Sequence, residues 1–556
     1  MGRVDGRLLA LLLAVSAGVA SGCGWEEPSG CEWWVGKLKR GEEVQVAIAR
    51  VTEGACTDAR PALAGLAADP HLGGDALAAL IALGRTPESE DAVRKALARP
   101  GQAAAAAAQV EAWKLSAALP ELRAALADET LAPQRGILLK AALAVTSPDA
   151  LAGVLLELAA APSADPATRE LALDALTRVD WSAAQAEVGE AAKVLGALVL
   201  EDDASDAALR ALVRLPDGTA PAASLTRGAE GGDPQALLLV WAMAPDVGRA
   251  AALAALARGP EPGWSTAATL AVGRAAEVLD GALAAEAPDP DRLWQLTLAA
   301  GRAAEPSLAR AAESGTGDLR AAATRALVLV LDGEALTRWR EAAEKHPSAL
   351  VREVAARADV RAVEALTQAC GEDAACLARE VEAMAPGLVA LGAELDGAEQ
   401  TLAAARQTAE AAVAADRERA QVLAGSTGEA AASSEARKEL EALRARRDEA
   451  WKAVEAAAAQ VDSRRALLTR ATVAARRLAE PTAGSADLAV EAATTLLRSA
   501  RGEAAATLRR WALAVLSARA TAEDAESIRR VAGTLSADPT LSFALARLAA
   551  RLDARR

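Results

Sequence analysis

PDALAGVLLELAAAPSADPATRELALDALTRV, residues 148–179, is the stretch that decides the fold. Its first half places Leu151, Val154, Leu155 and Leu158 at positions i, i+3, i+4 and i+7. Side chains at that spacing lie on one stripe of an α-helix, and here the stripe is apolar. The pattern therefore predicts a short amphipathic helix that buries one side.

A second helix is expected directly after a turn in the same stretch. Asp165 has the side chain of an N-cap, and Pro166 would occupy the first helical position, where its missing N–H costs nothing. The residues expected to face inward are Ala172, Leu176 and Val179. Two short helices bury too little apolar surface to be stable alone, so the unit must stack on neighbours.

The second-helix pattern recurs along the chain at intervals of about 28 to 36 residues, as expected for a repeat array. The matching segments are residues 75–83, 135–145, 169–179, 206–215, 234–243 and 319–331. Residues 216–233 and 257–266 are richer in Gly and Pro, which predicts loose chain or a bend. Roughly nine repeats would fit the available length.

The composition favours helices over sheets. Hydrophobic residues make up 52% of the chain but aromatic residues only 2%, with no Tyr and a single Phe, Phe543. A core of Ala, Leu and Val suits closely packed helices, and no sustained period-2 run of β-branched residues is present. We therefore expect an all-α protein.

The array resembles the HEAT repeat family, most closely at residues 148–179 and 306–331. Both units have a Leu-rich first helix, a short turn and a second helix rich in Arg and Ala, and Arg169 and Arg320 match the family's second-helix arginine. The resemblance implies an α-solenoid over residues 57–366 that binds proteins along an extended surface. The alternative is a helical body that acts only as a spacer.

Beyond Pro386 the apolar spacing changes to the 3-4 pattern of a heptad repeat. The first run is Leu388, Leu391, Leu395, Ala398, Leu402, Ala405, Ala409 and Ala412. The second run is Leu440, Leu443, Ala450, Val454, Ala457, Val461, Leu468, Ala471, Ala475 and Leu478, with Arg447 and Arg464 interrupting it. Gly and Ser between the runs would form a turn. We expect an antiparallel coiled-coil hairpin over residues 386–480, with two ordinary helix pairs as the alternative, and further helical repeats over 481–556.

The N-terminal residues 1–22 have the three parts of a secretory signal, a positive start, an apolar run and a small-residue cleavage site. The sequence from Ala20 to Cys23, Ala-Ser-Gly-Cys, resembles the lipobox of bacterial lipoproteins, although Ala20 stands where that family usually has Leu. The resemblance implies acylation of Cys23, for example by palmitate, and anchoring in a membrane of the bacterial cell envelope. In that family an Asp after the cysteine favours retention in the inner membrane, so Gly24 at this position implies, by the same resemblance, the outer membrane. Ordinary secretion is the alternative.

Four further cysteines form an even number in what would be an oxidising compartment. Three pairings are open, and we favour Cys31–Cys56 and Cys370–Cys376 because each closes a short local loop. The first would staple a cap at residues 23–56 and the second a corner at residues 367–385, where we expect Gly371 to end a helix. Zinc binding is the alternative, but it lacks nearby His or Cys partners. Trp25, Trp33 and Trp34 would fill the cap or rest at lipid headgroups.

The net charge of the chain and the motifs that it lacks limit the classes of function to be considered. A formal net charge of -15 argues against a general nucleic-acid binder. Arg pairs at 509–510 and 529–530 suggest an acidic partner or solvated helix faces. The acidic cluster at 201–206 suggests a cation site or a helix-dipole partner, the reading we favour. His71 and His346 have no companion at metal-ligand spacing, and HExxH, P-loop, GxGxxG, GxSxG and EF-hand patterns are absent.

From these observations we expect that the protein is not an enzyme and that it binds no cofactor and no metal. The favoured function is a membrane-tethered scaffold of the bacterial envelope that binds a protein partner along the solenoid. A structural or self-associating envelope spacer is the alternative, and a ligand-binding or enzymatic HEAT-like protein is a weaker one.

Overall fold

The computed structural model describes residues 30–201, 205–258, 263–285, 289–425, 434–480, 486–502 and 505–555. Every regular element in these ranges is a helix, which confirms the all-α prediction. The chain divides into two compact units, Met1–Ala175 and Leu176–Arg556. The expected signal peptide, Cys23, Trp25 and most of the turn expected in the hairpin lie outside the described residues.

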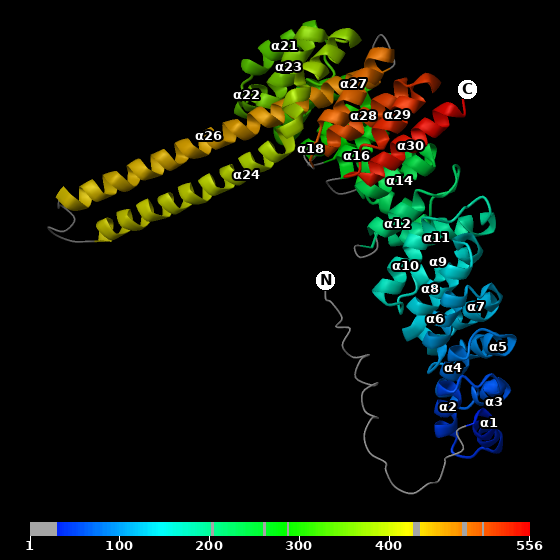
Figure 1. Ribbon diagram of the computed structural model, residues 1–556. Coiled ribbons are helices and arrows are strands. Elements are labelled where there is room, and N and C mark those ends of the chain that lie inside the picture. The colour runs from blue at the N-terminus through cyan, green and yellow to red at the C-terminus, as the bar shows by residue number, and fades with distance from the viewer. Residues whose placement is uncertain are drawn as a thin grey trace. The chain divides into compact units, whose positions relative to one another are not determined.

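The first unit is a stack of short helix pairs (Figure 1). Neighbouring helices pack on each other, and several also contact the helix two positions further along, for example α2 with α4 and α6 with α8. The helices are α1 Cys31–Arg40, α2 Val44–Glu53, α3 Arg60–Leu66, α4 Gly73–Ala82, α5 Pro87–Ala96, α6 Ala103–Trp113, α7 Leu119–Ala127, α8 Arg135–Val145, α9 Ala152–Ala160 and most of α10 Pro166–Leu176. This is the stacking expected of an α-solenoid.

The stretch at 148–179 folds as two helices, α9 and α10, with a short 3₁₀ turn before α9. Of the residues expected to face inward, Val154 is only half-buried, and the others are buried: Leu151, Leu155, Leu158, Ala172, Leu176 and Val179. The Asp165 carboxylate accepts the backbone N–H of Thr168 at 3.1 Å, so Asp165 caps the helix as expected. Burial and capping thus follow from the local pattern.

Arginines join successive repeats of the first unit. The Arg60 guanidinium donates to the Leu83 carbonyl at the end of α4, Arg99 donates to the Ala67 carbonyl after α3, and Arg123 donates to the Ala150 carbonyl. The last carbonyls of a helix have no partner within the helix, and a cation is favourable there because of the helix dipole. The Arg60 and Arg99 contacts therefore satisfy carbonyl groups at helix ends, whereas Ala150 lies in the 3₁₀ turn before α9. All three contacts join one repeat to the next.

The N-terminal cap is stapled by the Cys31–Cys56 disulfide, one of the two pairs favoured from the sequence. The Trp33 and Trp34 rings meet edge to face with their centroids 4.5 Å apart, and the Lys37 ammonium lies 4.2 Å from the Trp33 centroid. Trp34 is buried. These two indoles thus pack within the cap, the first of the two alternatives raised by the sequence.

The second unit begins with further helix pairs, which precede the two long helices of the hairpin. Its first helices are α11 Val188–Leu198, α12 Ser205–Leu212, α13 Ala223–Glu230, α14 Pro234–Met243, α15 Pro245–Arg258, α16 Gly263–Leu270, α17 Ala276–Leu283, α18 Pro290–Ala300, α19 Glu305–Ser314, α20 Gly317–Leu327, α21 Gly333–Glu344, α22 Ala349–Ala356 and α23 Ala358–Cys370. Alternate helices again contact each other, as α14 does α16 and α18 does α20.

Two segments expected to be loose contain helices. Residues 216–233 include α13, which buries Leu225 and Ala229, and residues 257–266 overlap α15 and α16. The prediction was wrong for residues 223–230, because it took Gly as a sign of loop. Residues 259–262, between α15 and α16, lie outside the described residues, so the loop or bend expected there stays a prediction. At Gly263 a Cβ atom would lie 1.9 Å from the Gly232 carbonyl oxygen, so glycine there permits close packing.

The antiparallel hairpin is formed by α24, Ala374–Gly425, and α26, Ser434–Ala479, which pack along each other and project from the rest of the second unit (Figure 1). The expected start at residue 386 was wrong, because α24 begins at Ala374 and runs through Pro386. Pro386 is exposed, so water can bond the carbonyl group that lacks an N–H donor there.

The C-terminal helices fold back onto the middle of the array (Figure 1). They are α27 Ala486–Ser499, α28 Ala506–Arg519, α29 Ala525–Ala532 and α30 Pro539–Asp553. Helix α28 packs on α16 and α26, α30 packs on α14, and α27 packs on α24. These helices therefore brace the hairpin against the array, rather than extending the array.

The two arginine pairs of this region differ: the first is held inside the molecule, and the second lies on an exposed helix face. Arg509 donates to the Ala500 carbonyl at 3.1 Å, and Arg510 donates to the Thr266 hydroxyl at 2.7 Å. Arg529 forms an ion pair with Glu526 at 2.8 Å. The suggestion that the first pair faces an acidic partner was wrong, because α28 turns it towards the array. Within the described ranges, no helix is both long enough and apolar enough to cross a membrane.

Candidate functional site: the base of the helical hairpin

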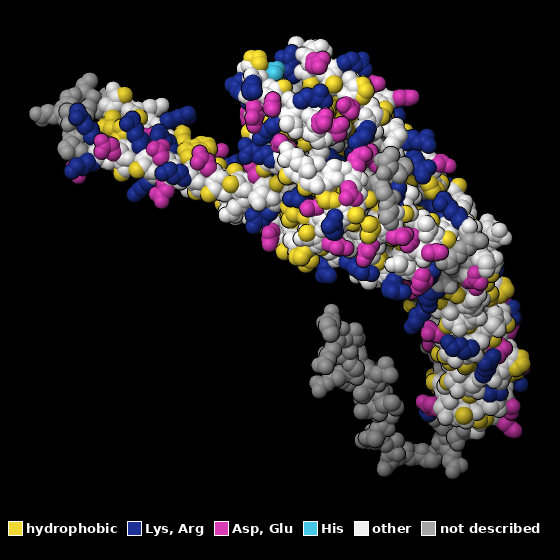
Figure 2. Space-filling view, turned by 90° about the horizontal axis from the view of Figure 1, so that it is seen from above, with side chains coloured by type: hydrophobic (Ala, Val, Ile, Leu, Met, Phe, Trp, Pro, Cys, Tyr) yellow, Lys and Arg dark blue, Asp and Glu magenta, His cyan; other side chains and the backbone are white. Residues whose placement is uncertain are grey.

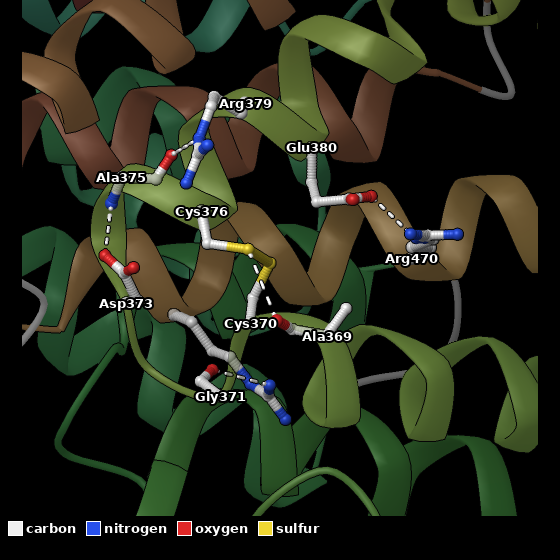
Figure 3. The surroundings of a disulfide bond; sticks show 10 residues. Ala369, Cys370, Gly371, Asp373, Ala375, Cys376, Arg379, Glu380 and Arg470 are labelled. Atoms are coloured by element: carbon white, nitrogen blue, oxygen red, sulfur yellow. Dashed lines mark hydrogen bonds and ion pairs between the residues drawn. A yellow bond between two sulfur atoms is a disulfide. The ribbon is translucent and has the colours of Figure 1, made fainter.

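The hairpin joins the array at a corner stapled by the Cys370–Cys376 disulfide, the second pair favoured from the sequence (Figure 3). Helix α23 ends at Cys370, and Gly371 follows with a φ of +56°, a conformation that glycine adopts without strain. The Asp373 carboxylate accepts the backbone N–H of Ala375 at 2.9 Å, at the start of α24. The end of α23, the turn and the cap of α24 are thus all set by residues within the corner itself.

The returning arm of the hairpin holds this corner through Arg477. Its guanidinium donates to the Gly371 carbonyl at 3.1 Å and to the Thr367 hydroxyl at 2.6 Å. Burial, and next the charge of Arg476, lower the pKa of Arg477 to about 10. The side chain is still a cation at neutral pH, so the corner contains a desolvated positive charge. Nearby, an ion pair between Glu380 and Arg470 joins the two arms (Figure 3).

Arg476 ties the same arm to the array. Its Nε donates to the Leu298 carbonyl in α18 at 3.3 Å, and its Nη2 pairs with the Glu480 carboxylate at 2.5 Å. Gly301, with a φ of +66°, follows α18 directly, and a Cβ atom there would lie 2.5 Å from Nη2 of Arg476. Glycine is therefore needed at 301 for both its backbone conformation and its lack of a side chain.

A pocket of about 510 Å³ opens beside Arg476, between the array, the end of α26 and α28. Its apolar wall includes Trp241, Leu270, Val272, Leu298 and Leu513. Its charged side chains are Arg249, Arg274, Arg302, Arg476 and Glu480. The pocket thus combines an apolar body with a surplus of cations.

The distal hairpin is the other exposed feature. Its seam contains a cluster of Leu395, Ala398 and Val461, with Leu402 packed against it. Arg447, which interrupts the heptad pattern, pairs with Asp416 of the opposite arm at 2.7 Å. Charged and hydrophobic side chains alternate over the outer surface of the arms (Figure 2).

The structure brings together few of the residues singled out from the sequence. No group of His, Cys, Asp and Glu suited to a metal ion occurs in the described ranges. The His346 ring accepts the Ser348 backbone N–H at 3.1 Å, which is a turn contact. In the acidic cluster, Glu201 and Asp206 are exposed, and residues 202–204 lie outside the described residues.

Arg476 and Arg477 were not predicted from the sequence as functional residues. The heptad pattern assigned their neighbours Ala475 and Leu478 to the seam and left the two arginines without a role. The available signal was an adjacent pair of arginines inside an otherwise apolar segment, TVAARRLA, residues 472–479. Long cationic side chains in such a position need carbonyl or carboxylate partners when buried.

Comparisons with known proteins show no family for this chain. No family model matches the chain, and no curated protein matches it. Among solved structures, a crystal structure of importin beta in an ammonium sulfate condition aligns with 93% of this chain and 77% of that chain. The sequence identity is 14% and the TM-score is 0.21. The assignment as an all-α solenoid therefore rests on the helix packing of the chain itself.

Proposed function

We propose that the protein is an interaction scaffold of the bacterial cell envelope, held at a membrane by lipid on Cys23, and that it binds a protein partner through the hairpin and the array. The observation that carries the proposal is the hairpin itself. Two long helices pack on each other along a narrow seam and stand clear of the array over their distal part (Figure 1).

The outer faces of the arms suit a helical partner. Trp451 of α26 is 46% exposed and is the largest apolar side chain with such exposure in the described residues. A third amphipathic helix laid beside it would convert the two-helix hairpin into a three-helix bundle and bury the indole. Aromatic side chains that become buried on binding commonly dominate the affinity of such interfaces.

The tether is supported by the lipobox resemblance at Cys23 and by two disulfides. Disulfides form and persist in exported proteins. A single acyl chain binds a membrane weakly, whereas several chains, at about 0.8 kcal/mol per buried CH₂, hold a protein stably. Such an anchor would keep the scaffold at the membrane without a spanning helix.

The test combines localisation with capture. The full chain and its Cys23→Ser variant are expressed in the native host, and membrane and soluble fractions are compared. The native chain should be found with the membrane and the variant in the soluble fraction. Mass spectrometry of the N-terminal peptide should show acylated Cys23. An unmodified Cys23 in the mature protein would refute the tether.

Capture from envelope fractions by crosslinking then tests the hairpin. Trp451→Ala should reduce recovery of the partner at least about tenfold, the loss expected for a hot-spot aromatic. Its neighbour provides the control, because Lys452→Ala changes an exposed side chain on the same turn and should leave recovery unchanged. A protein recovered equally with both variants would not be bound by the hairpin, and recovery of none would contradict the scaffold.

The proposal is for a binding protein and assigns no catalysis, cofactor or metal. A spacer that assembles with itself is the competing function. It would form oligomers that dissociate as salt rises, because charged surfaces are screened. Light scattering at low and high salt separates the two functions, since a scaffold that binds another protein is expected to remain monomeric in both.

A further inference from the structure

The pocket at the hairpin base has more positive than negative charge. It is lined by four arginines, Arg249, Arg274, Arg302 and Arg476, and by one carboxylate, Glu480. Three of these arginines have carboxylate partners: the pairs are Arg249–Asp246, Arg302–Glu372 and Arg476–Glu480. In the part of the chain that is described, the Arg274 side chain has neither an ion pair nor a hydrogen bond. One net positive charge therefore remains at the pocket wall.

Arg476 makes this charge hard to solvate. Its side chain is only 3% exposed. Burial, with the nearby Arg302 charge as a smaller contribution, lowers its pKa. Among the described residues its Nε and Nη2 have partners, but Nη1 makes no hydrogen bond to protein. A guanidinium in this state is stabilised by an additional oxyanion, because charge-assisted hydrogen bonds are strong where water is excluded.

The remaining wall is apolar. Trp241, Leu270, Leu298 and Leu513 come from four different helices, and the volume of about 510 Å³ lies in the range of small-molecule sites. Such a wall favours a ligand with a hydrocarbon portion, whereas a bare inorganic ion would leave it in contact with water.

We propose that this pocket binds a small amphiphilic anion, with a carboxylate or phosphate head against Arg274, Arg302 and Arg476 and a short hydrocarbon body along the apolar wall. The site is lined by residues of α18, α26 and α28, so an occupant would touch both the array and the returning arm of the hairpin. The inference does not depend on the protein partner proposed above.

Isothermal titration tests the site, with the full chain carrying Cys23→Ser to remove the proposed lipid. The probes are octanoate, octyl phosphate, inorganic phosphate and 1-octanol. Octanoate or octyl phosphate should bind with one-to-one stoichiometry, and the tighter of the two identifies the head group. Inorganic phosphate and 1-octanol should each bind at least about tenfold more weakly, since each lacks one half of the proposed recognition.

Variants locate the site. Arg274→Glu should weaken binding of the tighter probe more than about tenfold, and Arg302→Ala should weaken it several-fold. Both side chains are exposed, so neither change should disrupt the core. The matched control is Arg338→Glu, which reverses the charge of an exposed arginine on α21 outside this pocket.

Three results would overturn the proposal. Failure of both octanoate and octyl phosphate to bind at millimolar concentration would show that the pocket does not take an amphiphilic anion. 1-Octanol binding as tightly as octanoate would show that the arginines contribute nothing. Equal losses for Arg274→Glu and Arg338→Glu would show a general effect of charge on the whole chain. Circular dichroism of each variant confirms that the helices remain folded.

Discussion

At the residue scale, the clearest electrostatic interaction is that of Asp359, at the start of α23, with two arginines. Its carboxylate accepts from Arg325 at 2.8 Å and from Arg357 at 3.2 Å. Burial by itself would raise the pKa of Asp359, but the two guanidinium groups outweigh it and lower the pKa below its ordinary value. Arg325 also pairs with Asp291 at 2.8 Å and lies over the Trp294 ring.

Replacement of Asp359 should therefore cost stability in a pH-dependent way. A carboxyl group with a lowered folded-state pKa stabilises the fold above its unfolded pKa of about 3.9, and this contribution is lost as pH falls through the folded value. We expect Asp359→Asn to reduce the free energy of unfolding by about 1–3 kcal/mol at pH 7. The deficit should shrink below about pH 4. Urea unfolding across this pH range measures it.

Asp291→Asn is the matched control. It removes the other carboxylate partner of Arg325, but the Asp291 side chain is 67% exposed against 11% for Asp359. Exposed ion pairs contribute about 0–1 kcal/mol. Equal losses for the two variants, or a loss at Asp359 that does not change with pH, would contradict the assigned role.

Residues whose role is local were predictable, and those with distant partners were not. Asp165 and Gly371 act within a few positions of themselves, so their side-chain type and context sufficed. Arg477 bonds a hydroxyl 110 positions away, and Arg476 bonds a carbonyl 178 positions away. Spacing rules relate neighbours on one helix, and they contain no information about which distant carbonyl a buried cation will reach.

At the scale of elements, the hairpin shows what a heptad pattern does and does not specify. The seam positions Leu395, Ala398 and Val461 are buried, as predicted from the 3-4 spacing. Much of the seam is alanine, which lacks the shape to select one alignment of the arms. Charged pairs across the seam select one alignment of the arms. In the sequence, such a pair was indicated by an arginine at a core position of the heptad pattern.

Asp416, in the distal part of α24, forms charged pairs across the seam. It pairs with Arg447 at 2.7 Å and with Arg444 at 3.7 Å, and its side chain is 13% exposed. Asp416→Ala leaves Arg447 without its cross-seam partner, so we expect a loss of about 1–3 kcal/mol. Hydrogen exchange should accelerate in residues 405–420 and 440–455 while α18 and α28 keep their protection.

The control for this prediction is Arg417→Ala, which removes an exposed charge one position along the same helix. Exchange in both arms should then stay within the range of the native chain, because surface substitutions usually change stability by less than about 0.5 kcal/mol. If Arg417→Ala loosened the arms as much as Asp416→Ala, the cross-seam pair would not set the register.

At the scale of the whole molecule, the sequence predicts a repeat array over residues 57–366, and the structure adds a division into two compact units after Ala175. The repeat pattern runs through this point without interruption, since residues 148–179 span it. Periodicity reports that a helix pair is present, but not how tightly it packs on the next pair. The packing of α28 on α16 and of α30 on α14 could not be predicted from periodicity either, because it joins segments that are far apart in the chain.

Each unit contains one disulfide, which makes the division testable. Cys31–Cys56 closes a loop with a separation of 25 residues in the first unit, and Cys370–Cys376 closes one of 6 residues in the second. By loop-closure entropy, replacing both cysteines with serine should cost about 3–4 kcal/mol in the first unit and about 2 kcal/mol in the second. Calorimetry should resolve two transitions, and hydrogen exchange should assign each to its residues.

We expect Cys31→Ser with Cys56→Ser to lower only the transition of residues 30–175, and Cys370→Ser with Cys376→Ser to lower only the other. The physical reason is that a crosslink restricts the unfolded ensemble of the segment it closes and has no effect on a unit that unfolds separately. A single transition shifted by either pair would mean that the whole chain unfolds as one cooperative body.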